Sequence, residues 1–541
     1  MANSIPKVPT PVNEPVLSYA PASPERARLE AELKRMKSEV LDIPLVIGGQ
    51  QIRTGNLGEC RIPHDHGHLL ARYHKAGAEE VAQAVTAANE AWQQWSEMSW
   101  HTRAGIFLRM AELLAGPYRM LLNASTMLGQ SKTCHQAEID SACEYIDFLR
   151  FNAHYMMEIY ARQPGSNPGV WNSVEYRALE GFIFAVTPFN FTSIAGNLST
   201  APAMMGNTVL WKPASSSVFS GWYLFKLFEE AGVPPGVINF LPGSGSQVGG
   251  PAIAHPQLAG VHFTGSTPVF QGMWKAIGDN IANYRAYPRI VGETGGKDFV
   301  FAHSSAQPEQ VAVALLRGAF EFQGQKCSAA SRAYLPESLW PAIRDRLLTD
   351  LATVKIGDVE DYSNFMGAVI DQAAWENIRS YIDFAKTSAD AEILHGGGCD
   401  DRRGWFIEPT VVVTSDPHFK LMEEEIFGPV LTIFVYPDAQ FEETLASCDA
   451  TSPYALTGAI FARDRYAVSV AAAKLRHSAG NFYINDKPTG AVVGQQPFGG
   501  SRASGTNDKA GSAENLMRWT SVRTIKENLL PPNDYRYPFM G

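Results

Sequence analysis

The sequence predicts an α/β protein with a parallel, doubly wound sheet, and the chain after Gly181 carries this prediction. Short apolar segments there alternate with helical ones. The expected strands are 182–188, 208–213, 237–242, 260–264 and 289–293, and the expected helices are 193–205, 217–231, 246–254 and 268–281. Parallel strands need a crossover connection, usually a helix, so this alternation indicates a parallel sheet. A length of 541 residues also predicts two or three domains.

The composition excludes several classes of binding partner and indicates a cellular compartment. The formal net charge is -10 and no dense Lys/Arg tract is present, so nucleic acid is not expected as a partner. No apolar run approaches the ~18 residues that span a bilayer, so no membrane partner is expected either. The six cysteines are scattered without a CxxC pair. This pattern favours reduced thiols in a cytosol-like compartment over disulfides or a zinc site.

Residues 1–40 are expected to form an N-terminal arm and a helix, the latter over 23–40. Residues 1–24 are rich in Pro, Ser and Ala and lack an apolar core, so a secretory signal is not expected. Strands are predicted at 43–53 and 69–74. Between them, His64–His68 contains three histidines and invites a metal interpretation. Gly67 favours a turn and no further ligands are indicated, so no metal site is expected.

Amphipathic patterns predict three helices before the α/β region, at 78–95, 102–122 and 136–157. The third carries four carboxylates that we expect to be mostly solvated: Glu138, Asp140, Glu144 and Asp147. A loop is predicted at 163–174 and an exposed strand at 175–179. After Lys297 a second series of elements is expected, at 308–322, 332–335, 339–351, 372–387 and 410–413.

Cys327 is the candidate nucleophile. It follows the predicted turn at Gly324 in a polar setting where Lys326 and the hydroxyls of Ser328 and Ser331 could favour the thiolate. A single such cysteine is more often a small buried hydrophobe. Glu293 adds a carboxylate in a glycine-rich turn after an apolar strand, and a thiol with a carboxylate base is a workable acyl-transfer pair.

Glycine-rich stretches at strand ends indicate a phosphate-bearing ligand. Residues 243–245 and 263–266 each follow a predicted strand and precede a helix, where backbone N–H groups can meet a pyrophosphate. Neither fits GxGxxG, so the common Rossmann fingerprint is absent. Residues 423–430 run from an acidic cluster into Phe and Gly-Pro. Residues 481–505 are dense in glycine and are predicted to be a loop that lines a site for a polar ligand.

Together these stretches resemble the NAD(P)-dependent aldehyde dehydrogenase superfamily over about residues 40–525. The matching pieces occur in the family's order: 187–191, 211–213, 263–266, 293–297, 324–327, 425–429 and 497–500. Within that family the chain is most similar to the branch that oxidises L-glutamate γ-semialdehyde, formed from Δ1-pyrroline-5-carboxylate, in proline catabolism. The pieces that carry this finer likeness are 189–192, 323–329, 494–500, 503–509 and the Asn-Glu-Pro-Val-Leu that begins at Asn13.

The resemblance implies a domain plan and an assembly. Residues 41–160 and 181–296 would form a Rossmann-type NAD-binding domain, and residues 297–510 an α/β catalytic domain. Residues 161–180 and 511–541 would form a small β oligomerisation arm, so a homodimer or an assembly of dimers is expected. The N-terminus favours a bacterial cytoplasm, with the mitochondrial matrix as the alternative for a trimmed eukaryotic protein.

The resemblance also implies chemical roles. Cys327 would attack the aldehyde, the amide of Asn190 and the backbone N–H of Cys327 would stabilise the oxyanion, and Glu293 would activate the water that hydrolyses the thioester. NAD is the expected cofactor. Its ribose hydroxyls would meet Lys212 and Glu425, its pyrophosphate Gly265 and Ser266, and its nicotinamide ribose Phe427. Ser215 stands where many NAD-selective relatives have Glu, so rejection of NADP by charge is not assured.

For the aldehyde substrate, the resemblance implies recognition at both ends. Backbone amides at Gly490 and Ala491, with Ser328, would receive the α-carboxylate, and Glu144 would face the amino group. Phe191 and Phe498 would sandwich the methylenes. Without the resemblance, Glu144 reads as a surface charge and the two Phe as core.

Three other functions remain open alternatives. One is a dehydrogenase for another acidic semialdehyde, such as succinate semialdehyde. The others are a non-catalytic relative and a cofactor-free thiol amidase or acyltransferase.

Overall fold

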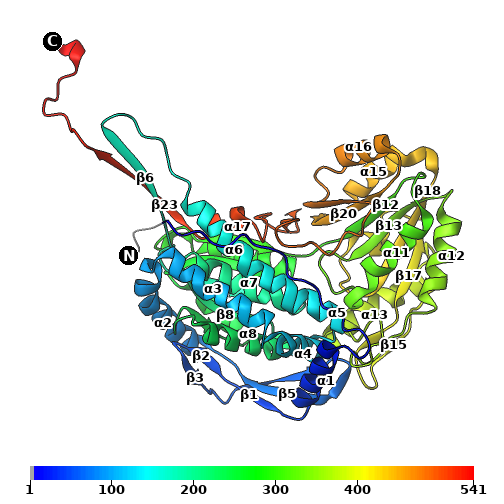
Figure 1. Cartoon of the computed structure of the whole chain (residues 1–541). Coiled ribbons are helices and arrows are strands. Elements are labelled where there is room, and N and C mark those ends of the chain that lie inside the picture. Colours follow the sequence, from blue (N-terminus) through cyan, green and yellow to red (C-terminus); the bar gives the residue numbers. More distant parts are fainter. Residues whose placement is uncertain (1–4) are drawn as a thin grey trace.

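The protein, described over residues 5–541 by a computed structural model, is built around two seven-stranded sheets (Figure 1). The order of the first sheet is β11-β10-β7-β8-β9-β2-β3. Its strands from β11 to β9 are parallel, while β2 and β3 are antiparallel additions at one edge. The strand bounds are β2 (Leu45–Ile47), β3 (Gln50–Ile52), β7 (Phe182–Val186), β8 (Thr208–Lys212), β9 (Ile238–Phe240), β10 (Leu258–Thr264) and β11 (Arg289–Glu293).

Helices cover both faces of this sheet because its strands are apolar on both sides. One face packs against α2 (Ala78–Glu97), α9 (Gly245–Ala254) and α10 (Thr267–Asp279). The other packs against α3 (Trp100–Ala115), α6 (Tyr145–Tyr160), α7 (Thr192–Met204) and α8 (Val218–Ala231). The strands and helices predicted between 182 and 293 are therefore present, with ends that differ by a few residues.

The second sheet has the order β14-β17-β18-β13-β12-β20-β21 and is parallel except for β14 at its edge. Its strands are β12 (Asp298–Ala302), β13 (Ala330–Pro336), β14 (Ala391–His395), β17 (Thr410–Thr414), β18 (Val430–Tyr436), β20 (Thr457–Phe461) and β21 (Asn481–Ile484). The helices α11 (Pro308–Phe320) and α12 (Trp340–Leu351) cover one face. The other face packs against α13 (Gln372–Thr387), α15 (Phe441–Ala450) and α16 (Arg465–Lys474).

Three predictions about local structure were wrong. The helix expected at 102–122 is two helices, α3 and α4 (Arg119–Gln130), because Pro117 removes a backbone donor and disfavours helix at Gly116. The loop expected at 163–174 already contains the start of β6 (Val170–Arg177). The long loop expected at 481–505 begins with β21, which pairs with β20.

The helix expected at 136–157 is interrupted by a π-helix. It consists of α5 (Cys134–Ala137), the π-helix η1 (Glu138–Glu144) and α6. Its carboxylates were predicted to be solvated, and this too was wrong, since Glu138, Asp140 and Asp147 are all buried. They meet Arg119, Lys132 and the N-terminal arm, all distant enough in sequence to escape the helical pattern.

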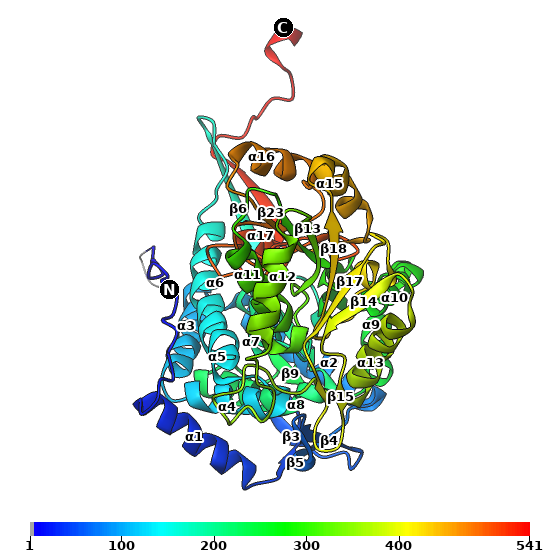
Figure 2. The ribbon, with the colours of Figure 1, turned by 90° about the vertical axis from the view of Figure 1, so that its right-hand side faces the viewer.

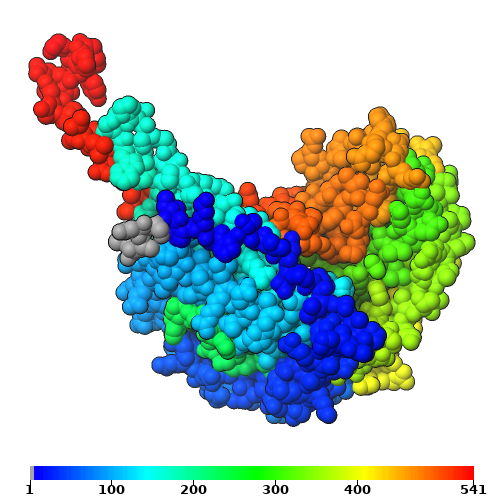
Figure 3. All heavy atoms as spheres, in the orientation of Figure 1, coloured from blue at the N-terminus to red at the C-terminus, as the bar shows by residue number. Residues whose placement is uncertain are grey.

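Two peripheral segments complete the fold. The strand β6 pairs antiparallel with β23 (Ser521–Asn528) in an exposed ribbon that projects from the body, with the C-terminal tail beyond it (Figures 1 and 2). Residues 5–23 of the N-terminal arm, ahead of α1 (Pro24–Lys37), lie across the surface of the first half of the chain (Figure 3). The first four residues of the predicted arm lie outside the described residues. Within residues 5–541, no helix has the length and apolar character needed to cross a membrane.

Candidate active site

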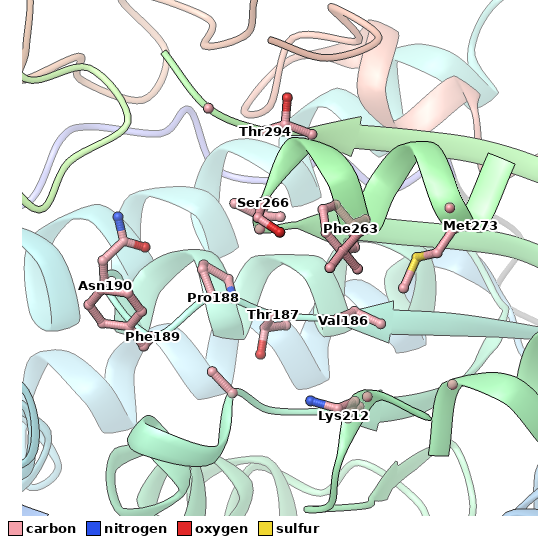
Figure 4. Close-up of a pocket in the computed structure, with 18 of the residues that line it drawn as sticks. Val186, Thr187, Pro188, Phe189, Asn190, Lys212, Phe263, Ser266, Met273 and Thr294 are labelled. Carbon is pink, nitrogen blue, oxygen red and sulfur yellow. The ribbon is translucent and has the colours of Figure 1, made fainter. Parts of the chain in front are cut away.

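A cavity of about 810 Å³ lies where the strands of the first sheet end. Residues after β7, β8, β10 and β11 line it, together with Cys327, Glu425 and Phe427 from the second half of the chain. Figure 4 shows Asn190, Ser266 and Lys212 arranged around this space. Ligands of open α/β sheets bind beyond the carboxyl ends of the strands, so this is the expected place for one.

The turn before Cys327 is held by buried amide side chains. Phe322 and Gln323 adopt left-handed backbone conformations, with φ of 51° and 56°. The side chain of Gln323 donates to the carbonyl oxygen of Ser131 at 3.0 Å, and that of Gln325 accepts from the N–H of Ile370 at 2.9 Å. The strained turn is thereby tied to neighbouring segments, and it presents Cys327 at the cavity wall.

Burial raises the pKa of the Cys327 thiol well above its usual range, and the nearby carboxyl groups of Asp298, Glu425 and Glu293 raise it further. The three groups expected to favour the thiolate are engaged elsewhere. Lys326 Nζ lies 3.2 Å from Glu321, Ser331 accepts from Lys297 at 2.6 Å, and Ser328 donates to Thr489 at 2.9 Å. That part of the prediction was wrong, because these side chains pair with groups other than the Cys327 thiol.

Asn190 lies close to the Cys327 turn. Its Nδ2 donates to the carbonyl oxygen of Gln325 at 3.0 Å, and the side chain is buried at the cavity wall. An amide carries two N–H donors, so one remains for an oxygen that develops negative charge near Cys327.

Glu293 ends β11 and is half-buried. Its Oε2 accepts a hydrogen bond from the N–H of Gly500 at 3.1 Å. Burial raises the pKa of this carboxyl well above its usual range, and the Gly500 bond and the charge of Lys509 only partly oppose that rise. A carboxyl with a raised pKa next to a thiol is suited to general base chemistry near neutral pH.

Two ionisable side chains in the cavity wall each make only one hydrogen bond within the described residues. Lys212 Nζ donates to the carbonyl oxygen of Pro213 at 3.1 Å, and burial lowers its pKa to about 8. Glu425 Oε1 accepts from the N–H of Gly296 at 2.9 Å, and burial raises its pKa to about 7. Both groups keep capacity for further hydrogen bonds, which suits the hydroxyls of a sugar.

The phosphate-facing side of the cavity is formed by helix starts and glycines. Ser266 is the N-cap of α10, and Gly245 opens α9. A Cβ added at Gly245 or Gly250 would meet no heavy atom within 4 Å. The backbone at these two positions is therefore accessible to a ligand in the cavity. Phe427, at φ 58°, packs edge-on to Phe189. Charged groups that can bind ribose hydroxyls, Lys212 and Glu425, lie in the same cavity as these accessible helix N-termini. This combination suits a dinucleotide such as NAD.

The predicted substrate residues lie outside the lining of this cavity. Glu144 Oε2 accepts from Ser193 Oγ at 2.8 Å, and burial raises its pKa to about 8. Phe191 lies under Lys132, whose Nζ is 4.2 Å from the ring centre. Within residues 5–541, the lining of the 810 Å³ cavity includes none of the six: Glu144, Phe191, Ser328, Gly490, Ala491 and Phe498.

Sequence reasoning missed the ion pair between Lys132 and Asp140. Lys132 Nζ lies 2.6 Å from Asp140 Oδ2, and both residues are buried. Asp140 also accepts from the backbone N–H groups of Thr192 and Ser193 at 3.0 and 2.9 Å. The pair fixes the start of α7, directly after Asn190 and Phe191. The only signal in the sequence was the run of carboxylates, which alone could not indicate a buried cation.

The histidines at 64–68 do meet acidic residues. His64 is buried, its Nδ1 lies 3.0 Å from Ser131 Oγ, and its Nε2 lies 3.3 Å from Asp358. Together with Glu360 these groups lie close enough to share an ion. The ammonium of Lys37 lies 2.5 Å from Glu360, however, and already balances that carboxylate.

The fold and the site define the class of protein: the chain belongs to the aldehyde dehydrogenase family, whose profile matches residues 53–525. The mitochondrial Δ1-pyrroline-5-carboxylate dehydrogenase of Dictyostelium discoideum is 56% identical over 536 residues, 98% of this chain and 96% of the relative. The human mitochondrial enzyme of the same name is 47% identical over 529 residues, 98% and 94% of the two chains.

A solved structure gives the same result. The Δ-pyrroline-5-carboxylate dehydrogenase of Mycobacterium tuberculosis bound with NAD superposes with a TM-score of 0.97 at 51% identity, covering 100% of both chains. The predicted family and α/β fold class are confirmed.

Proposed function

We propose that this protein oxidises L-glutamate γ-semialdehyde, formed from Δ1-pyrroline-5-carboxylate, to L-glutamate with NAD in proline catabolism. The observation that carries the proposal is the convergence of Cys327, Asn190 and the Glu293 turn beside a cavity that also contains Lys212 and Glu425. The relatives named for pyrroline-5-carboxylate dehydrogenase support the substrate, and the NAD-bound neighbour supports the cofactor.

In this reaction the Cys327 thiol loses its proton to water and Sγ bonds to the aldehyde carbon, while the carbonyl oxygen takes the electron pair of the C=O π bond. The free N–H of Asn190 and the backbone N–H of Cys327 donate to that oxyanion. Bound NAD would supply the acceptor for the hydride that leaves this carbon, and Cys327 would then carry the acyl group as a thioester. Glu293 then takes a proton from water, the water oxygen bonds to the carbonyl carbon, and the C–S bond breaks to free carboxylate and thiol.

The remaining residues would hold the two ligands. Lys212 and Glu425 bind the ribose hydroxyls of NAD, Gly265 and Ser266 its pyrophosphate, and Phe427 its nicotinamide ribose. For the substrate, Gly490, Ala491 and Ser328 receive the α-carboxylate, Glu144 pairs with the ammonium, and Phe191 and Phe498 enclose the methylenes. The hydrogen bond between Ser193 and Glu144 supports this role, because it orients the carboxyl group.

The domain plan and the assembly are also part of the proposal. Residues 41–160 and 181–296 form the NAD-binding domain and 297–510 the catalytic domain, while 161–180 and 511–541 form the arm of a homodimer. The exposed β6–β23 ribbon supports a dimer, since its outward side chains include Trp171 and Val522. A bacterial cytoplasm or a mitochondrial matrix is the proposed compartment, and relatives named as mitochondrial support the second.

A substrate panel tests the function. NADH formation is measured by absorbance with pyrroline-5-carboxylate, succinate semialdehyde and a simple alkyl aldehyde. The proposal predicts a clear preference in kcat/KM for pyrroline-5-carboxylate. Equal or higher values with the two amine-free aldehydes would contradict the proposed substrate and leave the family assignment intact.

A further inference from the structure

The N-terminal arm reaches two parts of the proposed substrate site at once. Asn13 lies in this arm, far in sequence from both. Its Nδ2 donates to Asp147 Oδ2 and to the carbonyl oxygen of Val493, each at 2.8 Å. Its Oδ1 accepts from Gln495 Nε2 at 2.9 Å. One side chain therefore joins α6 to the loop 490–496, which begins with Gly490 and Ala491.

The loop itself has little regular structure to hold it. Its internal hydrogen bonds run from the N–H of Val492 to Gln496 Oε1 and from the N–H groups of Gln495 and Gln496 to the carbonyl oxygen of Val492, at 2.9 to 3.0 Å. Gly494 lies so close to the ring of Phe151 in α6 that a Cβ there would clash. The position of the loop thus depends on contact with α6 and on the arm that joins the two.

The rest of the arm is anchored by two buried carboxylates, Glu138 at the start of the π-helix and Asp147 in α6 just after its end. Asp147 also accepts from the N–H of Glu14 at 2.7 Å, and Glu138 accepts from the N–H of Leu17 at 2.8 Å and from Tyr19 Oη at 2.7 Å. Glu144, the proposed ammonium partner, is the last residue of the π-helix and lies between Glu138 and Asp147 in sequence. π-Helical segments are frequent at functional sites, and this one is fixed by the arm on both sides.

We propose that Asn13 is a positioning residue for the substrate: it holds the loop 490–496 so that the backbone amides of Gly490 and Ala491 meet the α-carboxylate. This inference rests on the proposed function. Asn13 acts only through the loop and touches neither the cavity lining nor Cys327. Its loss therefore weakens binding of the carboxylate-bearing substrate, and leaves NAD binding and the chemical steps unchanged.

The test compares three variants of the full chain. Asn13→Ala removes all three hydrogen bonds. Asn13→Asp keeps the shape but sets a second acceptor against Asp147 Oδ2 and the Val493 carbonyl. Val12→Ala is the matched control, because Val12 is the neighbouring arm residue and its side chain is exposed. KM and kcat are measured for pyrroline-5-carboxylate, for NAD and for a simple alkyl aldehyde, with the thermal midpoint as a check of folding.

We expect KM for pyrroline-5-carboxylate to rise roughly tenfold in Asn13→Ala, the size of one or two lost hydrogen bonds, and at least as much in Asn13→Asp. The KM for NAD, the kcat with pyrroline-5-carboxylate, and both KM and kcat for the alkyl aldehyde should stay within about twofold of the wild-type values. Hydrogen exchange should accelerate at the amides of Val492, Gln495 and Gln496, which a purely remote structural role would not alter.

The outcomes separate this inference from the proposed function. An active wild type with unchanged KM and unchanged loop exchange in both Asn13 variants would overturn the role of Asn13 alone. An equal rise in KM for all three ligands would overturn it too, since that indicates general damage. A wild type inactive on pyrroline-5-carboxylate would overturn the proposed function, and the substrate role of Asn13 with it, even if the loop exchanges faster in the variants.

Discussion

The side-chain amide of Asn190 and the main chain of Gln325 are joined by one hydrogen bond, with Nδ2 and the carbonyl oxygen 3.0 Å apart. The bond connects the segment after β7 of the first sheet to the turn that carries Cys327 before β13 of the second. It leaves the second N–H of Asn190 free while fixing the amide beside the thiol. The position of a donor for the oxyanion therefore depends on contact between the two halves of the chain.

Asn190→Ala should lower kcat about 100- to 1,000-fold, because it removes a donor to the charge that develops in the transition state. NAD affinity, measured by fluorescence titration, should be unchanged. Asn283→Ala is the control, since Asn283 is exposed and distant from the cavity lining. A loss of less than about tenfold in Asn190→Ala would mean that another group carries the oxyanion.

Thioester hydrolysis should depend on pH through Glu293. The base acts when deprotonated, and burial raises its pKa well above the usual ~4.3, so hydrolysis should be fast above that raised pKa and slow below it. Glu293→Gln should slow hydrolysis about 100- to 10,000-fold and leave a glutamyl adduct on Cys327 after one turnover, visible by intact mass. An acid limb near pH ~4.3 in the wild type, or no adduct in the variant, would contradict this role.

Glu144→Gln tests ammonium recognition with little change of shape. A charge-assisted hydrogen bond is worth ~1.5–3 kcal/mol, so kcat/KM for pyrroline-5-carboxylate should fall about 10- to 100-fold. The value for a simple alkyl aldehyde should not change. Glu158→Gln, at an exposed position of α6, serves as the control. Equal losses on both substrates would assign Glu144 a structural role.

Glu138→Ala tests the anchoring of the arm. Glu138 is fully buried and pairs with Arg119, Asn123 and Tyr19. Removing one partner of a buried ion pair leaves the other uncompensated, so the free energy of unfolding, measured in urea, should fall by ~3 kcal/mol or more. Asp279→Ala breaks the exposed pair with Lys275 and should cost less than ~1 kcal/mol. Similar losses in the two variants would contradict the account of Glu138.

Much of the fold could be predicted from local patterns. The alternation of apolar and helical segments after Gly181 indicated the strands β7, β8, β9, β10 and β11 in their order, because each segment carries its own periodicity. The break at Gly116–Pro117 was visible in the sequence but was outweighed by the amphipathic pattern on both sides. The π-helix η1 could not be predicted, since it has no periodicity of its own over so short a length.

The hydrogen-bond and charge partners of the site residues were harder to predict than the site residues themselves. Lys326 is next to Cys327 in sequence, but its ammonium pairs with Glu321, and neighbours in sequence need not face each other in a turn. Glu138 and Asp147 looked like surface charges because their partners, Arg119 and the arm at Asn13 and Glu14, lie far away along the chain. Contacts between distant segments decide burial, and one sequence does not reveal them.

The most direct test of the central claim compares wild type and Cys327→Ala for NADH formation with pyrroline-5-carboxylate and NAD. NAD binding and the thermal midpoint are measured in both to show that the cavity and the fold persist. We expect steady NADH formation by the wild type and none above background in the variant, with NAD binding unchanged. Substantial NADH formation by Cys327→Ala would contradict a mechanism through a Cys327 thioester.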